Sequence, residues 1–265
     1  MARPLERTAL RWEQPATRKF AGSIVILPEL FTTNSHYSLL SGYLTSVGWE
    51  VCTVDAYAGL ERRRFAGLCD SVAEAIAASG REVILLGHGL GGLMAFALDA
   101  RAAVVASVAL APALPGFRSP LLDGLRNRLA AIRGALIRPP SGRALFEFVA
   151  DADRFQRDAL IRELTPGDAT ALREIARGAI GVPPIGATPR LIVAGDSDIF
   201  APHEQVSRFA AVAGAQRATL SGRGHWLVGG RALEKTVNEL QRFLIKSLGR
   251  DLLLLYPPDP PDEPS

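Results

Sequence analysis

The sequence predicts an α/β fold built on a mostly parallel sheet with helices on both faces. Short β-rich runs alternate with amphipathic helical patterns, which is typical of a parallel sheet covered on both sides. A glycine-rich turn, GHGLGG at residues 87–92, joins an apolar run to an apolar helical pattern. A long segment with proline-rich and helical stretches interrupts the alternation. With 265 residues and 48% hydrophobic content, the chain can bury one such core.

Six apolar runs are the predicted parallel strands, at residues 23–28, 50–55, 82–87, 103–111, 190–195 and 215–220. The segment TALRWE near the start can add an antiparallel edge strand. Between the runs, apolar residues recur at helical spacing, which predicts helices at residues 36–47, 61–79, 90–101, 202–213 and 230–248.

This order divides the chain into four parts. The core is predicted in two halves, residues 1–111 and 189–250, with a helical cap inserted at 112–188. Apolar residues of the cap can pack it onto itself, line an apolar pocket over the strand ends, or do both. The tail, 251–265, is rich in proline and acidic residues and is predicted to be disordered.

Charge and composition exclude several classes of function. The formal net charge is +3, and no basic stripe is interleaved with aromatic residues, so no nucleic-acid partner is expected. No stretch approaches eighteen uncharged apolar residues, and the N-terminus has no apolar signal-peptide core. A cytoplasmic monomer or homodimer without membrane contact is expected. Cys52 and Cys69 lack metal-ligand spacing, and no metal or cofactor is expected.

The glycine-rich turn fits two patterns. Gly87, Gly89 and Gly92 satisfy G-x-G-x-x-G, the fingerprint of dinucleotide-binding folds. That fingerprint requires an acidic residue about 20 positions later, at the end of the next strand. The next predicted strand, 103–111, contains no acid, and strands precede the turn, so a nucleotide site is disfavoured. The alternative is the G-x-S-x-G nucleophile elbow, with glycine in place of serine.

Two downstream motifs favour the elbow. GDSDIFAP resembles the acid loop of α/β-hydrolases, with the acid at Asp198, and GRGHW resembles their histidine loop, with the histidine at His225. The order is the one expected of a nucleophile, an acid and a histidine. The chain therefore resembles the α/β-hydrolase superfamily over about residues 20–248. The resemblance implies that Asp198 orients His225, whose other ring nitrogen is then a general base.

Two departures fall on catalytic positions. Gly89 occupies the serine position, so there is no hydroxyl to attack an acyl carbon. Pro28-Glu29 stands where the family has His-Gly or Pro-Gly, in the loop that helps to form the oxyanion hole. A carboxylate there opposes a developing oxyanion unless it is protonated or turned away. Glu29 is either a solvated loop residue or a general acid in the pocket.

Around this site the resemblance places the oxyanion and pocket residues Leu30, Phe31, His88 and Leu90. His88 is expected to pack beneath the turn without a chemical role. His225 and Asp198 can also be an ordinary loop histidine and a turn-forming aspartate, although their order favours a functional pair.

Three hypotheses follow. The favoured one is an enzyme that uses His225 and Asp198 without a covalent intermediate, as a lyase, isomerase, cyclase or direct hydrolase acting on a hydrophobic small molecule. The second is a catalytically inactive relative that binds such a molecule or a partner protein. The third is a serine hydrolase whose serine was replaced by Gly89 in the laboratory, against which the second departure, at Glu29, counts.

Overall fold

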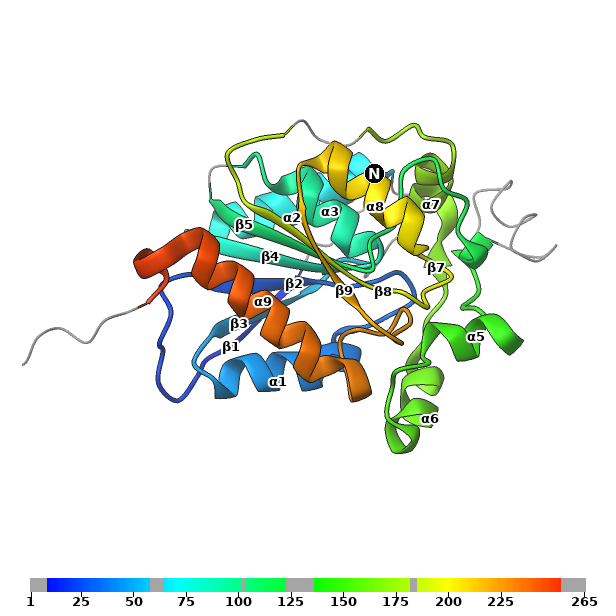
Figure 1. The fold of residues 1–265 in the computed structure, drawn as a ribbon, viewed down its shortest axis with the longest axis horizontal. Coiled ribbons are helices and arrows are strands. Elements are labelled where there is room, and N and C mark those ends of the chain that lie inside the picture. The colour runs from blue at the N-terminus through cyan, green and yellow to red at the C-terminus, as the bar shows by residue number, and fades with distance from the viewer. Residues whose placement is uncertain (1–8, 58–63, 102, 123–135, 182–184, 254–265) are drawn as a thin grey trace, which may run out of the picture.

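The computed structural model describes residues 9–57, 64–101, 103–122, 136–181 and 185–253. A seven-stranded sheet with the order β1-β3-β2-β4-β5-β8-β9 forms its centre (Figure 1). The first strand pairs antiparallel with β3 as the expected edge strand, and the other pairings are parallel. The strands are β1 (Ala9–Glu13), β2 (Ser23–Leu27), β3 (Glu50–Asp55), β4 (Val83–His88), β5 (Val104–Leu110), β8 (Arg190–Gly195) and β9 (Gln216–Leu220).

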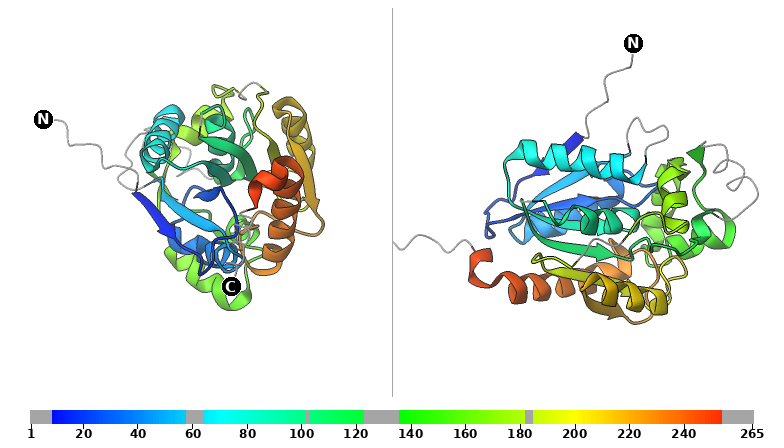
Figure 2. Two further views of the ribbon diagram at one scale, coloured as in Figure 1. Left: turned by 90° about the vertical axis from the view of Figure 1, so that its left-hand side faces the viewer. Right: turned by 90° about the horizontal axis from the view of Figure 1, so that it is seen from above.

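Helices cover both faces of the sheet, which confirms the predicted fold class. One face carries α2 (Phe65–Ser79), α3 (Leu90–Leu98) and α8 (His203–Ala213), and the other carries α1 (Ser38–Ser46) and α9 (Leu233–Leu248) (Figures 1 and 2). Because the central strands are covered on both sides, every residue of β2 and β4 is buried. In α9 the buried residues recur every three or four positions, as expected of an amphipathic helix.

Several element ends differ from the predicted ranges. Short 3-10 turns, η1 (Asn34–Tyr37) and η3 (Gly230–Ala232), occupy the starts of two predicted helices. The helix α3 ends at Leu98, before the predicted residue 101. Residues 61–63 of the predicted helix 61–79 lie outside the described residues. Apolar periodicity locates a helix but does not distinguish a 3-10 turn from its first α-helical turn.

A group of helices lies beyond the carboxyl ends of the strands, between β5 and β8 in the sequence (Figure 1). It contains η2 (Pro120–Leu122), α5 (Gly142–Phe148), α6 (Arg154–Glu163), α7 (Ala169–Ala176) and a small sheet of β6 (Leu136–Ile137) and β7 (Gly167–Asp168). These elements lie in the segment predicted to be a cap, of which residues 123–135 and 182–184 fall outside the described ranges. Phe148 is fully buried, whereas Leu136 and Phe146 are exposed.

The folded core continues into the predicted C-terminal tail. After α9, the turn η4 (Gly249–Leu252) leads to a bridge between Leu253 and Phe20. Leu252 is buried, and its carbonyl accepts the N–H of Ala21. The turn η4 therefore extends the described structure into the predicted tail, where Leu252 buries its apolar side chain. The rest of the predicted tail, 254–265, lies outside the described residues.

Within the described ranges, none of the helices has the length and apolarity needed to cross a membrane.

Candidate active site

A tight turn at Gly89 connects β4 to α3. Its φ of 53° and ψ of −113° are unfavourable for residues with a side chain, and its N–H donates to the carbonyl of Leu110 at 2.9 Å. The flanking glycines permit close backbone approach. A Cβ at Gly87 would overlap the carbonyl of Gly91, and one at Gly91 would overlap that of Leu27. Both flanking glycines therefore have the structural role expected of them.

The carboxylate of Glu29 lies against this turn. In the parallel pairing of β2 with β4, Leu27 is opposite Gly87, so the chain beyond β2 brings Glu29 beside Gly89. A Cβ built at Gly89 would overlap Glu29 Oε2. With an exposed fraction of 2%, the glutamate is buried, and the alternative of a solvated loop carboxylate is wrong.

Two backbone N–H groups hold the other oxygen of this carboxylate. Glu29 Oε1 accepts from Leu30 N at 2.5 Å and from Leu90 N at 3.2 Å. The sequence placed Leu30 and Leu90 at the oxyanion site, and their N–H groups converge on one point. The structure fills that point with a side-chain oxygen of the protein itself.

His225 and Asp198 meet at the same place. His225 Nδ1 is 2.9 Å from Asp198 Oδ2, and His225 Nε2 is 3.3 Å from Glu29 Oε2. Asp198 Oδ1 accepts the N–H of Phe200 at 2.7 Å, which fixes the carboxylate. The imidazole also contacts the rings of Phe148 and Phe200, with centroids 5.2 and 5.0 Å away. The side chains of Asp198, His225 and Glu29 are all buried, and they contact one another in that order as one continuous line.

The electrostatics of this line favour a charged imidazole. Burial alone lowers the pKa of His225, but the charge and hydrogen bond of Asp198, followed by those of Glu29, outweigh burial and raise the pKa to about 10. At neutral pH His225 is therefore an imidazolium between two carboxylates. Its Nε2 then carries a proton, whereas the sequence analysis assigned this nitrogen the role of a general base.

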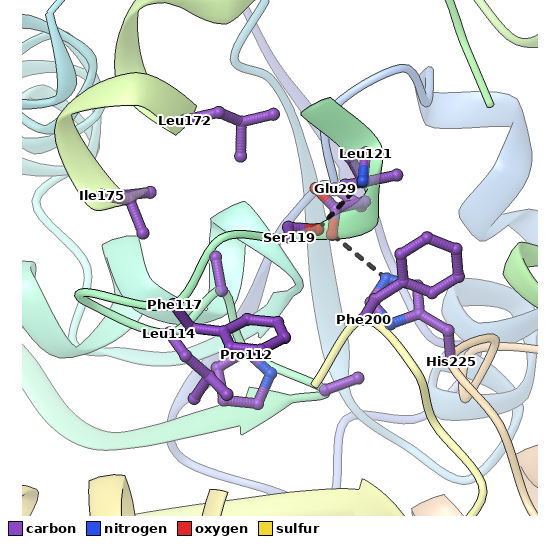
Figure 3. A pocket seen from close by; sticks show the side chains of 12 residues that line it. Glu29, Pro112, Leu114, Phe117, Ser119, Leu121, Leu172, Ile175, Phe200 and His225 are labelled. Carbon is purple, nitrogen blue, oxygen red and sulfur yellow. Dashed lines mark hydrogen bonds and ion pairs between the residues drawn. The ribbon is translucent and has the colours of Figure 1, made fainter. Parts of the chain in front are cut away.

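A narrow apolar cavity opens onto this line, and Figure 3 shows Glu29 and His225 pointing toward each other at its edge. The space open to the centre of a water molecule is about 20 Å³, enough for about one water. Its lining comprises Glu29, Ala111, Pro112, Ala113, Leu114, Phe117, Ser119, Leu121, Leu172, Ile175, Phe200 and His225. Leu121, Leu172 and Ile175 come from η2 and α7, so apolar residues of the predicted cap line the cavity.

Phe31 and His88, which we expected around the oxyanion site and pocket, are not among the lining residues of this cavity. Phe31 is buried with a φ of 74°, and its carbonyl accepts the N–H of Thr165 at 2.9 Å, so it fastens the loop to the segment after α6. The imidazole of His88 is buried, with Nε2 3.0 Å from the carbonyl oxygen of His225.

Asp151, which follows α5, holds the loop that carries His225, and sequence reasoning missed it. Its Oδ2 accepts the N–H of Gly224 at 2.5 Å, and its Oδ1 lies 3.4 Å from Arg223 and 3.3 Å from Arg231. A lone acidic residue in a helical segment resembles any solvated charge, so the sequence carried no signal for this contact. Tyr37 and Ser119 were missed too, because neither belongs to a sequence motif.

No group of three or more His, Cys, Asp or Glu side chains suited to a metal ion occurs in the part of the chain that the structure describes.

A mostly parallel sheet with a strand–turn–helix at Gly89, followed in the chain by Asp198 and His225, is typical of the α/β hydrolase class. The chain belongs to the Alpha/beta hydrolase family, which matches residues 35–239. No curated protein matches it.

Solved structures agree on the fold. A monoacylglycerol lipase from Paleococcus ferrophilus superposes with a TM-score of 0.68 at 18% identity, covering 90% of this chain and 99% of the lipase. A soluble variant of monoglyceride lipase from Saccharomyces cerevisiae has a TM-score of 0.69 at 14% identity, covering 92% of this chain and 94% of the yeast lipase. Est1E from Butyrivibrio proteoclasticus, solved with ferulic acid, has a TM-score of 0.61 at 17% identity, with 91% and 95% covered.

Proposed function

We propose that the protein is an enzyme that transfers protons on a hydrophobic small molecule, without a covalent intermediate. The observation that carries the proposal is the buried line of Glu29, His225 and Asp198 at the edge of an apolar cavity. The chemistry that fits is that of an isomerase, a lyase or a cyclase.

Serine-type acyl transfer is disfavoured at two points. Gly89 stands at the nucleophile position of the turn and has no hydroxyl to attack an acyl carbon. Acyl transfer also needs two N–H groups free to bind the developing oxyanion. Here the N–H groups of Leu30 and Leu90 already bind Glu29 Oε1. Hydrolysis by direct attack of water on an ester would need the same two donors, so it is disfavoured as well.

Two of the roles expected from the sequence are exchanged. Two N–H groups donate to Glu29 Oε1, and Oε2 faces His225 Nε2, so we assign Glu29 the role of proton acceptor rather than proton donor. His225, whose pKa is raised to about 10, is the proton donor. Asp198 holds the imidazolium through Nδ1 and stabilises its charge.

These roles give a balanced proton cycle. Glu29 Oε2 takes a proton from an acidic carbon of the substrate, and the electron pair released forms a double bond within it. His225 Nε2 gives its proton to the atom that gains electron density, either a carbonyl oxygen or a leaving group. Transfer of a proton from Glu29 Oε2 to His225 Nε2, which lie 3.3 Å apart, then restores both groups.

The lining of the cavity indicates which class of substrate it could accept. Apart from Glu29, Ser119 and His225, the side chains of its described lining are apolar, which suits a hydrophobic molecule. Since the open space holds about one water, a substrate must separate the side chains of η2 and α7 from the turn as it enters.

Hydrogen exchange tests the proposal directly. A panel of apolar ketones with acidic carbon–hydrogen bonds is incubated in D₂O with the wild type, with Glu29→Gln and with His225→Gln, and deuterium uptake is followed by NMR. We expect the wild type to accelerate uptake at one carbon, and each variant to lose at least about 100-fold of that acceleration. Equal acceleration by all three proteins would refute the assigned roles.

Labelling with a fluorophosphonate tests for serine chemistry, with the Ser119→Ala variant as the matched control. We expect no labelling of the wild type. Labelling that disappears in Ser119→Ala would establish a serine nucleophile and overturn the non-covalent mechanism.

The second candidate is a binding protein without turnover, for which the same apolar lining is sufficient. Binding of a panel molecule to the wild type with no exchange at any carbon would support this alternative. The third candidate, a serine hydrolase with an engineered glycine, requires Gly89→Ser alone to produce esterase activity.

A further inference from the structure

A buried tyrosine connects the backbone of Glu29 to a histidine. Tyr37, in η1, is fully buried, and its Oη accepts the N–H of Glu29 at 2.7 Å. The same oxygen lies 3.2 Å from His88 Nδ1 and 3.1 Å from Thr32 Oγ1. Thr32 donates to the carbonyl of Glu29 at 2.6 Å. Tyr37 and Thr32 therefore hold both polar backbone groups of Glu29.

His88 continues the connection to His225. Its Nε2 is 3.0 Å from the carbonyl oxygen of His225, and a carbonyl can only accept, so Nε2 carries a hydrogen. Burial and the nearby charge of His225 lower the pKa of His88 to about 3, so the ring is neutral and has a single N–H. Its Nδ1 is therefore an acceptor, and Tyr37 must donate to it.

The hydrogen bonds that run from Glu29 through Tyr37 and His88 to His225 form one path. With these assignments, every donor on the path has an acceptor. The Glu29 N–H donates to Tyr37 Oη, the Tyr37 hydroxyl donates to His88 Nδ1, and the His88 Nε2–H donates to the His225 carbonyl. The path joins the main chains of the two residues whose side chains meet at 3.3 Å. Those residues are 196 positions apart in the sequence.

We infer that Tyr37 and His88 are positioning residues that hold the Glu29 carboxylate opposite the His225 imidazole. The inference rests on the proposed function for its catalytic meaning, since it concerns the same pair. Three titratable groups face the His225 ring: Asp198 and Glu29, which raise its pKa, and the neutral His88, whose ring centroid is 5.0 Å away. Breaking a hydrogen bond of this path lets Glu29 move away from His225. Asp198 and His88 do not replace the negative charge that His225 then loses.

The chain offers a matched control in a second tyrosine. Tyr57 Oη donates to the carbonyl of Pro28 at 2.8 Å, in the same loop as Glu29 but without a contact to either histidine. The Tyr37→Phe and Tyr57→Phe variants each remove one hydroxyl that bonds to the backbone of this loop. Only the first interrupts the path to His225.

The measurement is an NMR titration of the His225 ring in the wild type and in both variants, without substrate. We expect Tyr37→Phe to lower the pKa of His225 by about one unit or more, a tenfold change in its proton affinity, and Tyr57→Phe to change it by less than about 0.3 unit. If the two variants shift the pKa equally, or if neither does, the inference is wrong.

Two additions keep the test decisive. Should Tyr37→Phe fail to fold, His88→Gln replaces it, because glutamine keeps an N–H donor for the His225 carbonyl and loses the contact with Tyr37. The same downward shift is then expected, and an unchanged pKa overturns the inference. Because the titration uses no substrate, its outcome is independent of turnover and separates this inference from the proposed function.

Discussion

Replacing Glu29 by glutamine removes one negative charge beside His225 and leaves the shape of the side chain almost unchanged. The amide oxygen can still accept from the N–H groups of Leu30 and Leu90, as Oε1 does in the wild type. The amide nitrogen then faces His225 Nε2 in place of Oε2, and it favours a neutral ring that can accept its hydrogen. We therefore expect the pKa of His225 to fall.

The size of the fall follows from the separation of the charges. Two unit charges 3.3 Å apart interact by about 5 kcal/mol at an effective dielectric of ~20, which is about 3.7 pKa units and an upper limit. An adjacent opposite charge commonly shifts a pKa by about 1–3 units. The pKa of His225, about 10 in the wild type, should accordingly lie between about 7 and 9 in Glu29→Gln.

The assay is a titration of the His225 ring nitrogens by two-dimensional ¹H–¹⁵N NMR from pH 5 to 11, with Asp196→Asn as a control. Asp196 is an exposed acid in the loop that also carries Asp198, and it bonds to Gly222 rather than to His225. We expect the control to keep the wild-type pKa. A shift of less than about half a unit in Glu29→Gln would refute the claim that this carboxylate helps to hold the charge on His225.

Three further predictions concern stability. The pKa of His225 is raised from 6.5 to about 10, so its protonation contributes at most about 5 kcal/mol to the free energy of unfolding. This contribution is complete below pH 6.5 and disappears as the pH rises to about 10. Urea unfolding at several pH values should show the decline, and a flat profile would contradict it. Gly89→Ala places a Cβ against Glu29 and a side chain at a positive φ, so we expect the free energy of unfolding to fall by about 1–3 kcal/mol. The fall should be smaller in a Glu29→Ala background. Equal losses in both backgrounds would show that the two residues do not compete for space. Asp99→Ala removes the carboxylate that pairs with the buried Arg190 guanidinium, so urea unfolding should show a loss of stability of about 3–5 kcal/mol. A loss below about 1 kcal/mol would mean that the pair is not buried in solution.

Much of the fold was predictable because it depends on local patterns. The central strands are buried on both faces and therefore appear as continuous apolar runs, and each lies within two residues of its predicted range. Element ends were less predictable. The 3-10 turns before α1 and α9 and the burial of Leu252 depend on contacts with distant segments, such as the bond from Ala21 to Leu252.

The sequence by itself determined which groups the site contains: a glycine in the turn after β4, an acid and a histidine in the expected order, and a glutamate after β2. It left open whether the glutamate is solvated, and it assigned Tyr37 no part. Tertiary structure buries the glutamate and brings the Tyr37 hydroxyl to its backbone N–H. The pairing of Leu27 with Gly87 brings Glu29 beside the turn, where the missing side chain leaves room for a carboxylate. Such a carboxylate is stable when buried only if donors and an opposite charge surround it, and here these come from segments far apart in the sequence.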